Sequence, residues 1–215
     1  MSSPNSLILL GAGGHAKVVS EVARSAGWRI AGFLAPECGR GEQNLCAPLL
    51  GNGLDLTANP TWLEQNDLFP AIGQGEIRWR EFVRLAAAGA RVPYLVHPSA
   101  LVSPSAQIEA GAVVMAGAII QANSVIGPAA IINTGAQVDH DCHIGAGTMI
   151  APGAVLCGDV HVGDHAFVGA GAVIVPRIRI GRGAFVGAGT TVVNDIMDGS
   201  QIKASRRSHI VPRPE

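Results

Sequence analysis

Charged and aromatic side chains are scarce in this chain of 215 residues, of which 14% are charged and 4% aromatic. Disordered proteins combine low hydrophobicity with high net charge, but here 48% of residues are hydrophobic and the net charge is −1, which excludes that class. Nucleic-acid binders carry a basic excess, and 15 Lys and Arg against 16 Asp and Glu exclude it too. Four cysteines are too few for a disulfide scaffold and indicate a reducing compartment.

Targeting and membrane-spanning segments are also missing from the pattern. Residues 1–5 contain no basic residue, and the apolar run at residues 7–10 is too short for a signal peptide, so we expect a cytoplasmic protein. Residues 110–138 carry no charge and are long enough to cross a bilayer. They contain several amides, however, and a strict six-residue period explains them better than membrane insertion.

That period is the dominant feature of the sequence. From Val96 to Val192 an aliphatic residue recurs at every sixth position, seventeen times without an insertion and sixteen times β-branched. The residue four positions later is small in most repeats. A period of six matches neither a helix nor an alternating strand, and it predicts a β-solenoid with three short strands per coil around a narrow aliphatic core. We expect this solenoid to span residues 95–198, with residues 199–215 as a tail.

The first 94 residues follow a different pattern, which predicts a small α/β, Rossmann-like domain with a parallel sheet. Short apolar runs alternate there with segments of helical spacing. Strands are expected at Ser6–Leu10, Arg29–Leu34 and residues 68–72, and helices at residues 16–26, Pro60–Gln65 and residues 76–88.

A glycine-rich turn, Gly-Ala-Gly-Gly-His-Ala at residues 11–16, stands directly between the first strand and the first helix. Gly13 and Gly14 would let the backbone approach a pyrophosphate, and the helix N-terminus would supply free N–H groups. An NAD site and a turn that binds nothing are the alternatives, but the domain holds only one mononucleotide-binding half. We therefore expect a nucleotide-diphosphate sugar. The other contacts expected in this crevice are His15, Lys17 and Gly73.

The segment Val-Asp-His-Asp-Cys at residues 138–142 carries the candidate catalytic groups. A neutral imidazole titrates near working pH, which makes His140 the candidate base, and the adjacent Asp141 is placed to orient it. In an 18-residue coil the neighbour of His140 is Gly158, which should leave room beside the imidazole for a substrate or thioester. His143 and His161 should also stack, and a zinc site there, with His165 nearby, is a weaker alternative.

The hexads, the opening GAGGHAKVV and the VDHDC segment together resemble the hexapeptide-repeat, left-handed β-helix acyltransferases. Within them the whole chain resembles the NeuD/PglD-like sugar acetyltransferases, and most of all the perosamine N-acetyltransferases. The resemblance implies a homotrimer with active sites between subunits, acetyl-CoA as cosubstrate and no metal. It implies N-acetylation of a nucleotide-linked 4-amino-4,6-dideoxy sugar for surface-polysaccharide (O-antigen) synthesis. It also places His140 and Asp141 at the catalytic positions and Asn133 and Thr134 near the sugar.

Two departures from the family pattern affect the cosubstrate site. Met149 stands where the UDP-sugar enzymes have a second histidine against acetyl-CoA, so the thioester contact should come from backbone N–H groups near Gly158. The usual C-terminal Gly-x-Pro-Ala-Lys is replaced by Ile-Lys-Ala-Ser-Arg at residues 202–206, which keeps the positive charge that suits CoA phosphates. The other expected contacts with acetyl-CoA are Ala170, Gly171, Ala188, Lys203 and Arg206.

A third departure concerns the nucleotide. In the UDP-sugar enzymes paired acids follow the second strand, whereas here Glu37 is the single acid after Gly32 and Phe33. One carboxylate can accept two hydrogen bonds from guanine, which favours a GDP-linked sugar and leaves a UDP-linked one possible. O-acetylation of a sialic-acid-type sugar and a non-catalytic, sugar-nucleotide-binding or structural solenoid are the remaining alternatives.

Overall fold

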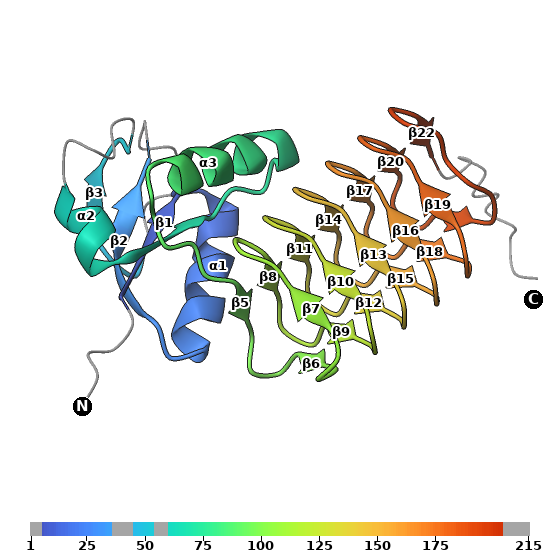
Figure 1. Cartoon of the computed structure of the whole chain (residues 1–215), viewed down its shortest axis with the longest axis horizontal. Coiled ribbons are helices and arrows are strands. Elements are labelled where there is room, and N and C mark those ends of the chain that lie inside the picture. Colours follow the sequence, from blue (N-terminus) through green and yellow to red (C-terminus); the bar gives the residue numbers. More distant parts are fainter. Residues whose placement is uncertain (1–5, 36–44, 54–59, 204–215) are drawn as a thin grey trace, which may run out of the picture.

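The computed structural model describes residues 6–35, 45–53 and 60–203, which form an α/β part followed by a solenoid (Figure 1). The α/β part holds a four-stranded parallel sheet in the order β3-β2-β1-β4. Its elements are β1 (Ser6–Leu10), α1 (Gly14–Ser25), β2 (Arg29–Leu34), β3 (Leu49–Gly51), α2 (Pro60–Gln65), β4 (Asp67–Pro70) and α3 (Gly75–Ala87). Within the described residues no helix is long and apolar enough to cross a bilayer.

The two faces of this sheet bury alternate residues of β1, as the two-residue period of a strand requires. Leu7 and Leu9 pack with α1 on one face. Ile8 and Leu10 pack with Leu85 of α3 on the other. The expected elements are present, but β4 covers residues 67–70 where residues 68–72 were expected, and it ends together with its neighbour β1, whose last residue Leu10 pairs with Pro70. The half-exposed β3 is too short for a sequence pattern to reveal.

The hexads form a left-handed β-helix in which each aliphatic residue of the period closes a two-residue strand. The first side of the coil holds β5 (Leu95–Val96), β8 (Val113–Val114), β11 (Ile131–Ile132), β14 (Met149–Ile150), β17 (Phe167–Val168), β20 (Phe185–Val186) and β22 (Gln201–Ile202). The second side holds β6 (Leu101–Val102), β9 (Ile119–Ile120), β12 (Gln137–Val138), β15 (Val155–Leu156), β18 (Val173–Ile174) and β21 (Thr191–Val192). The third side holds β7 (Gln107–Ile108), β10 (Val125–Ile126), β13 (His143–Ile144), β16 (His161–Val162) and β19 (Arg179–Ile180).

Three corners connect these sides. In one coil the first corner is residues 133–136, between β11 and β12. The second corner is residues 139–142, between β12 and β13, and the third is residues 145–148, between β13 and β14. Strands pair with the strand 18 residues away, except that Phe185 pairs with Gln201, so the last coil is two residues shorter and β22 lies beyond residue 198.

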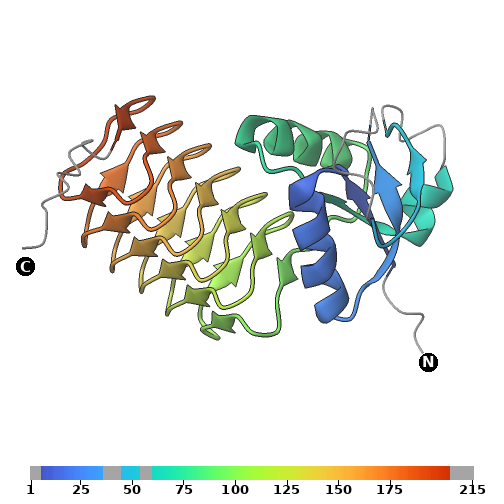
Figure 2. The ribbon, with the colours of Figure 1, turned by 180° about the vertical axis from the view of Figure 1, so that it is seen from behind.

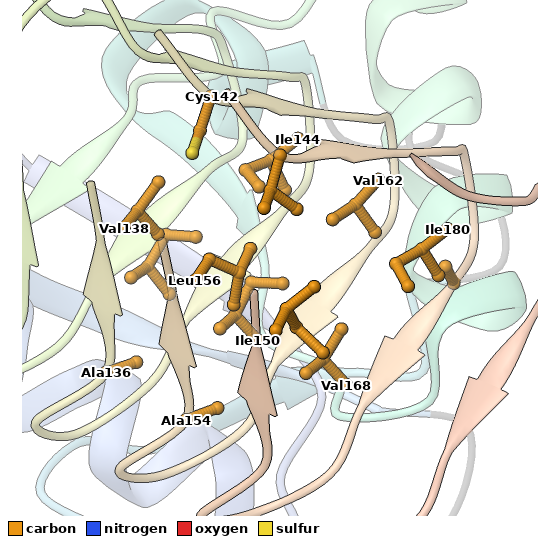
Figure 3. Close-up of a cluster of buried hydrophobic side chains, with 14 of the residues drawn as sticks. Ala136, Val138, Cys142, Ile144, Ile150, Ala154, Leu156, Val162, Val168 and Ile180 are labelled. Carbon is orange, nitrogen blue, oxygen red and sulfur yellow. The ribbon is translucent and has the colours of Figure 1, made fainter. Parts of the chain in front are cut away.

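The solenoid core consists of the aliphatic column and the small residues at the corners (Figure 3). Val138, Ile144 and Ile150 are at most 2% exposed, and Ala136 and Cys142 fill the corners beside them. Each fully buried Val or Ile contributes about 1.5–3 kcal/mol of transfer free energy. The triangular coil has room for aliphatic and small residues only, which explains why the sequence contains so few aromatic residues.

The α/β part packs on the first side and the third corner of the solenoid. Ala16 and Val19 of α1 share a buried cluster with Leu95, Val113 and Ile131 (Figure 2). At the third corner the Trp79 ring of α3 meets the His165 ring edge-on, with 5.6 Å between ring centroids. The two parts are therefore joined by a continuous apolar contact and a second contact along α3.

Changing Gly111 to alanine is expected to lower the thermal midpoint more than the matched change of Gly117. Both glycines have positive φ, +72° and +68°, for which alanine costs about 1–2 kcal/mol. A Cβ at Gly111 would lie 2.7 Å from Cδ2 of Phe82 on α3, whereas a Cβ at Gly117 has nothing within 4 Å. Thermal unfolding of both variants isolates the Phe82 contact, and equal losses would contradict the packing of α3 on this corner.

Candidate active site

His140 and Asp141 lie together at the second corner, directly after β12. His140 Nδ1 and Asp141 Oδ2 are 2.7 Å apart. Asn123 Nδ2, one coil earlier, donates to the other oxygen of Asp141 at 3.2 Å. The hydrogen bond with Asp141 raises the pKa of His140, and the same bond with His140, followed by that from Asn123, lowers the pKa of Asp141. The carboxylate therefore holds the Nδ1 proton, and the neutral ring presents Nε2 as an acceptor.

The second corner is built from polar residues where glycine would be expected. Asn123, Asp141, Asp159 and Arg177 occupy the same position in successive coils, and all have φ between +58° and +65°. Asn and Asp enter this left-handed region more readily than other side chains. At the first corner the corresponding position is occupied by glycine, as at Gly135 and Gly153. The second corner thus carries a column of polar side chains.

Gly158 lies one coil beyond His140, as the 18-residue period predicts, and Asp159 N donates to His140 O at 2.9 Å. A Cβ at Gly158 would overlap Nε2 and Cε1 of His140. The space expected there for a substrate is therefore filled by the imidazole itself. The open volume lies beside it, in a cleft of about 820 Å³. Its lining is Asp139, His140, Asp141, Cys157, Gly158, Asp159, Pro176 and Arg177.

The two cysteines of the solenoid, Cys142 and Cys157, both lie at the second corner. Cys142 is fully buried at the second corner, and its Sγ donates to Cys157 O at 3.3 Å. Burial raises the pKa of the Cys142 thiol to about 11, so it is protonated at neutral pH. Cys157 is partly buried at the edge of the cleft.

The residues expected to contact acetyl-CoA and the sugar lie mostly at the first corner. Asn133 Oδ1 accepts a hydrogen bond from Thr134 N at 2.8 Å. Asn133 and Thr134 lie before β12 (Gln137–Val138) and His140 lies after it, so within one chain these groups stand at different corners. Ala170, Gly171, Ala188 and Lys203 stand exposed at the first corner of later coils.

The glycine-rich turn opens the N-terminus of α1 to a ligand. Gly13 is the N-cap and forms no side-chain capping bond, and a Cβ at Gly13 or Gly14 would have nothing within 4 Å. The first N–H groups of a helix lack intrahelical partners, so this exposed end suits an anion. Lys17, the fourth residue of α1, is half-buried.

His15 is partly buried between this turn and the loop after β4. A Cβ at Gly73 would lie 3.6 Å from the Cβ of His15. Burial, followed by the charge of Arg78, lowers the pKa of His15 to about 4, so the ring is neutral at physiological pH. Its Nε2 is buried without a hydrogen-bond partner among the described residues.

A cavity of about 280 Å³ lies at the carboxyl edge of the sheet, where ligands bind in parallel α/β folds. Arg80, Glu81 and Arg84 of α3 line it, with Glu81 bonded to Arg84 at 2.6 Å. The sequence did not indicate these three residues, because they look like the solvated face of a helix. Two residues predicted from the sequence, Glu37 and Arg206, lie outside the described residues.

Of the three histidines considered for a metal site, His165 lies apart from the other two. The rings of His143 and His161 stack on the third side with centroids 4.8 Å apart, as expected from the period. His165 lies at the third corner against Trp79 instead. Over residues 6–35, 45–53 and 60–203 no three His, Cys, Asp or Glu side chains are grouped to hold a metal ion.

The three groups of candidate residues thus occupy different parts of the chain's surface. The crevice at the carboxyl edge of the sheet belongs to the α/β part, which packs on the first side and the third corner of the solenoid. His140 lies at the second corner, which is opposite the first side of the triangular coil. Asn133 and the expected CoA contacts lie at the first corner. A single chain therefore does not bring the three groups together at one corner.

Comparisons with known proteins agree with both parts of the chain. The PglD N-terminal domain matches residues 6–85, and the bacterial transferase hexapeptide (six repeats) matches residues 123–158 and 159–194. No curated protein sequence matches the chain.

Several solved structures are similar over almost the full length. The acetyltransferase domain of PglB from Neisseria gonorrhoeae, in complex with acetyl coenzyme A, is 39% identical over 94% of this chain and 97% of that chain, with a TM-score of 0.87. PerB from Caulobacter crescentus, in complex with CoA and GDP-perosamine, is 40% identical over 95% and 96%, with a TM-score of 0.85. WeeI from Acinetobacter baumannii is 25% identical over 93% and 97%, with a TM-score of 0.79.

Proposed function

Because the chain belongs to the acetyl-CoA-dependent sugar acetyltransferases that join a PglD-type domain to hexapeptide repeats, we propose that it N-acetylates the 4-amino group of a nucleotide-linked 4-amino-4,6-dideoxy sugar. GDP-perosamine is the favoured substrate, and a UDP-linked sugar is the alternative. The likeness to PerB, whose structure holds CoA and GDP-perosamine, carries this proposal, since it covers 95% of the chain at 40% identity. The single acid at Glu37 supports the choice of guanine from the sequence.

The His140–Asp141 pair supports a direct transfer. The unprotonated amine of the sugar attacks the thioester carbonyl, a C–N bond forms, and the C–S bond to CoA breaks. His140 Nε2 takes the proton that the amine loses, while Asp141 keeps the Nδ1 proton in place at 2.7 Å. We place the donors for the developing oxyanion among backbone N–H groups near Gly158, because Met149 offers no donor. No acyl-enzyme is required.

The assembly we propose is a homotrimer in which the second corner of one subunit faces the first corner of the next. This arrangement would bring His140 of one copy to Asn133 and the CoA contacts of another. The second side lies between these corners and carries partly or fully exposed aliphatic residues, with Leu101 68% exposed. Ile119, Val155 and Val173 continue that stripe, which subunit contact would cover.

Mixed trimers provide a test of the shared site. We expect His140→Ala and Asn133→Ala subunits to be impaired alone and to recover activity when co-expressed, because an interface with both corners intact then exists. Random assembly places one such interface in each mixed trimer, which corresponds to about one quarter of wild-type activity under cyclic symmetry. Initial rates of thiol release measure the recovery. A mixture no more active than its components would contradict a site built from two subunits.

The substrate is tested by release of CoA thiol over a panel of GDP- and UDP-linked 4-amino sugars, with product analysis for the amide. We expect the highest kcat/KM with GDP-perosamine. A clear preference for a UDP-linked amino sugar would overturn the guanine assignment and leave N-acetylation in place. Turnover only with a hydroxyl acceptor, such as a sialic-acid-type sugar, would overturn N-acetylation itself. A cytoplasmic location and a role in surface-polysaccharide synthesis stay predictions.

A further inference from the structure

Arg78 of α3 is fully buried, and all five of its N–H groups meet backbone carbonyl oxygens. These oxygens come from three separate segments: the loop after β4 and the third corner of two successive coils. The contacts are Nε to Ala129 O at 2.7 Å, Nη1 to Ile72 O at 3.0 Å and Gly73 O at 2.9 Å, and Nη2 to Gly147 O at 2.7 Å and Thr148 O at 3.3 Å.

This arrangement is energetically expensive for a contact that only holds two parts together. Burial lowers the pKa of Arg78 to about 10, so the guanidinium stays charged at neutral pH, while its bonds go to carbonyls and none to a carboxylate. Burying a charge without a counter-ion costs several kcal/mol, and apolar residues of similar size often serve as well. The apolar contact of α1 with the first side already joins the two parts. A planar guanidinium also fixes the orientation of the segments that it contacts, because its N–H groups hold their carbonyl oxygens in one geometry.

The three segments that Arg78 connects are those whose relative position matters for transfer. Ile72 lines the cavity at the carboxyl edge of the sheet, and Gly73 packs against His15. Ala129 and Gly147 occupy the same position in consecutive coils. The chain between them is the coil that carries His140. Arg78 thus fastens the crevice loop to the start and the end of the catalytic coil.

We propose that Arg78 is a positioning residue that sets the height of the nucleotide-sugar loop along the solenoid, level with the coil of His140. The inference rests on the proposed function. Cyclic symmetry rotates subunits without translating them. If the solenoids lie parallel to the axis, a loop level with His140 in its own chain is also level with His140 of the neighbour. The sugar amine then reaches the neighbouring imidazole only when the loop keeps this height.

The test uses the full chain with Arg78→Met, which keeps much of the side-chain volume and removes the five hydrogen bonds. We expect the Kd for the preferred nucleoside diphosphate, GDP or UDP, to rise at least tenfold by calorimetry. The Kd for CoA should stay within twofold, and kcat should fall, because the amine is no longer aligned. Arg78→Lys keeps the charge and donates fewer hydrogen bonds, so its Kd for the diphosphate and its kcat should lie between those of the wild type and Arg78→Met. It serves as a second variant where Arg78→Met does not fold.

Leu85→Ala is the matched control, because Leu85 is a fully buried residue of α3 that packs with Ile8 and Leu68 of the sheet. We expect it to lower the thermal midpoint and to leave both Kd values within twofold. An equal rise in both Kd values for the Arg78 variants, or the same selective loss in Leu85→Ala, would overturn the positioning role. So would a wild-type protein that binds neither diphosphate. Wild-type binding of a diphosphate without acetyl transfer to any amino sugar would instead overturn the proposed function, and the Kd ratio would still decide the role of Arg78.

Discussion

Replacing His140 by alanine is expected to lower kcat/KM for N-acetyl transfer at least tenfold, because the attacking amine loses its proton acceptor. The side chain is 58% exposed, so the fold and the thermal midpoint should change little. Steady-state kinetics with the preferred nucleotide sugar measure the loss. Wild-type kinetics in this variant would remove His140 from the mechanism.

The pH profile separates a proton acceptor from a group that only orients the amine. Asp141 raises the pKa of His140, mainly through their hydrogen bond, so Asp141→Asn should lower that pKa. The neutral imidazole is the active form, and its fraction grows as pH rises through the pKa. The acid limb of kcat/KM should therefore move to lower pH in Asp141→Asn, below a reduced maximum. If the acid limb of kcat/KM does not move, it reports the titration of a group other than His140.

Changing Gly158 to alanine is expected to reduce kcat about 100-fold while stability changes little. The added Cβ would overlap the outer ring atoms of His140, and this exposed ring can rotate away where backbone could not. A displacement of about 1 Å from the reacting geometry can cost about 100-fold in rate. Measuring kcat together with the thermal midpoint tests the expectation, since a large loss of stability would show that backbone and not the imidazole had moved.

The double variant supplies the control for this steric contact. Once His140 is alanine, the methyl group at position 158 has no imidazole to displace. Gly158→Ala should therefore have almost no further effect in the His140→Ala background, giving a strongly non-additive cycle. Additive losses would mean that residue 158 acts on the substrate directly and independently of His140.

The solenoid was predictable because its local and global patterns coincide. Every hexad has an aliphatic residue at the same position, so the phase set by Val96 determines the sides and corners as far as Val192. The α/β part was predictable where strands and helices were long enough to show a period. The three-residue β3 showed none, and the last coil departs from the period by two residues, which appears only as the pairing of Phe185 with Gln201.

The candidate site was predictable only as separate motifs. Adjacent residues such as His140 and Asp141 are local, and the period relates Gly158 to them. Nothing local places the imidazole over Gly158 in preference to a substrate, because that depends on the rotamer. Arg78 is one of several arginines in an amphipathic segment, and its burial depends on contacts with residues about 50 to 70 positions away. Tertiary packing decides such roles, so a single sequence does not reveal them.

The regular stacking of coils restricts how the distance between the nucleotide crevice and His140 can change. An insertion of a few residues between Ala129 and His140 would move core side chains to the surface, because each position of the coil has a fixed direction. Insertion of a complete coil leaves the core intact, and it would displace His140 from the crevice by one strand spacing, about 4.8 Å. The distance from the nucleotide crevice to His140 is thus adjustable in discrete increments in the solenoid, and fine adjustment is left to the loop that Arg78 holds.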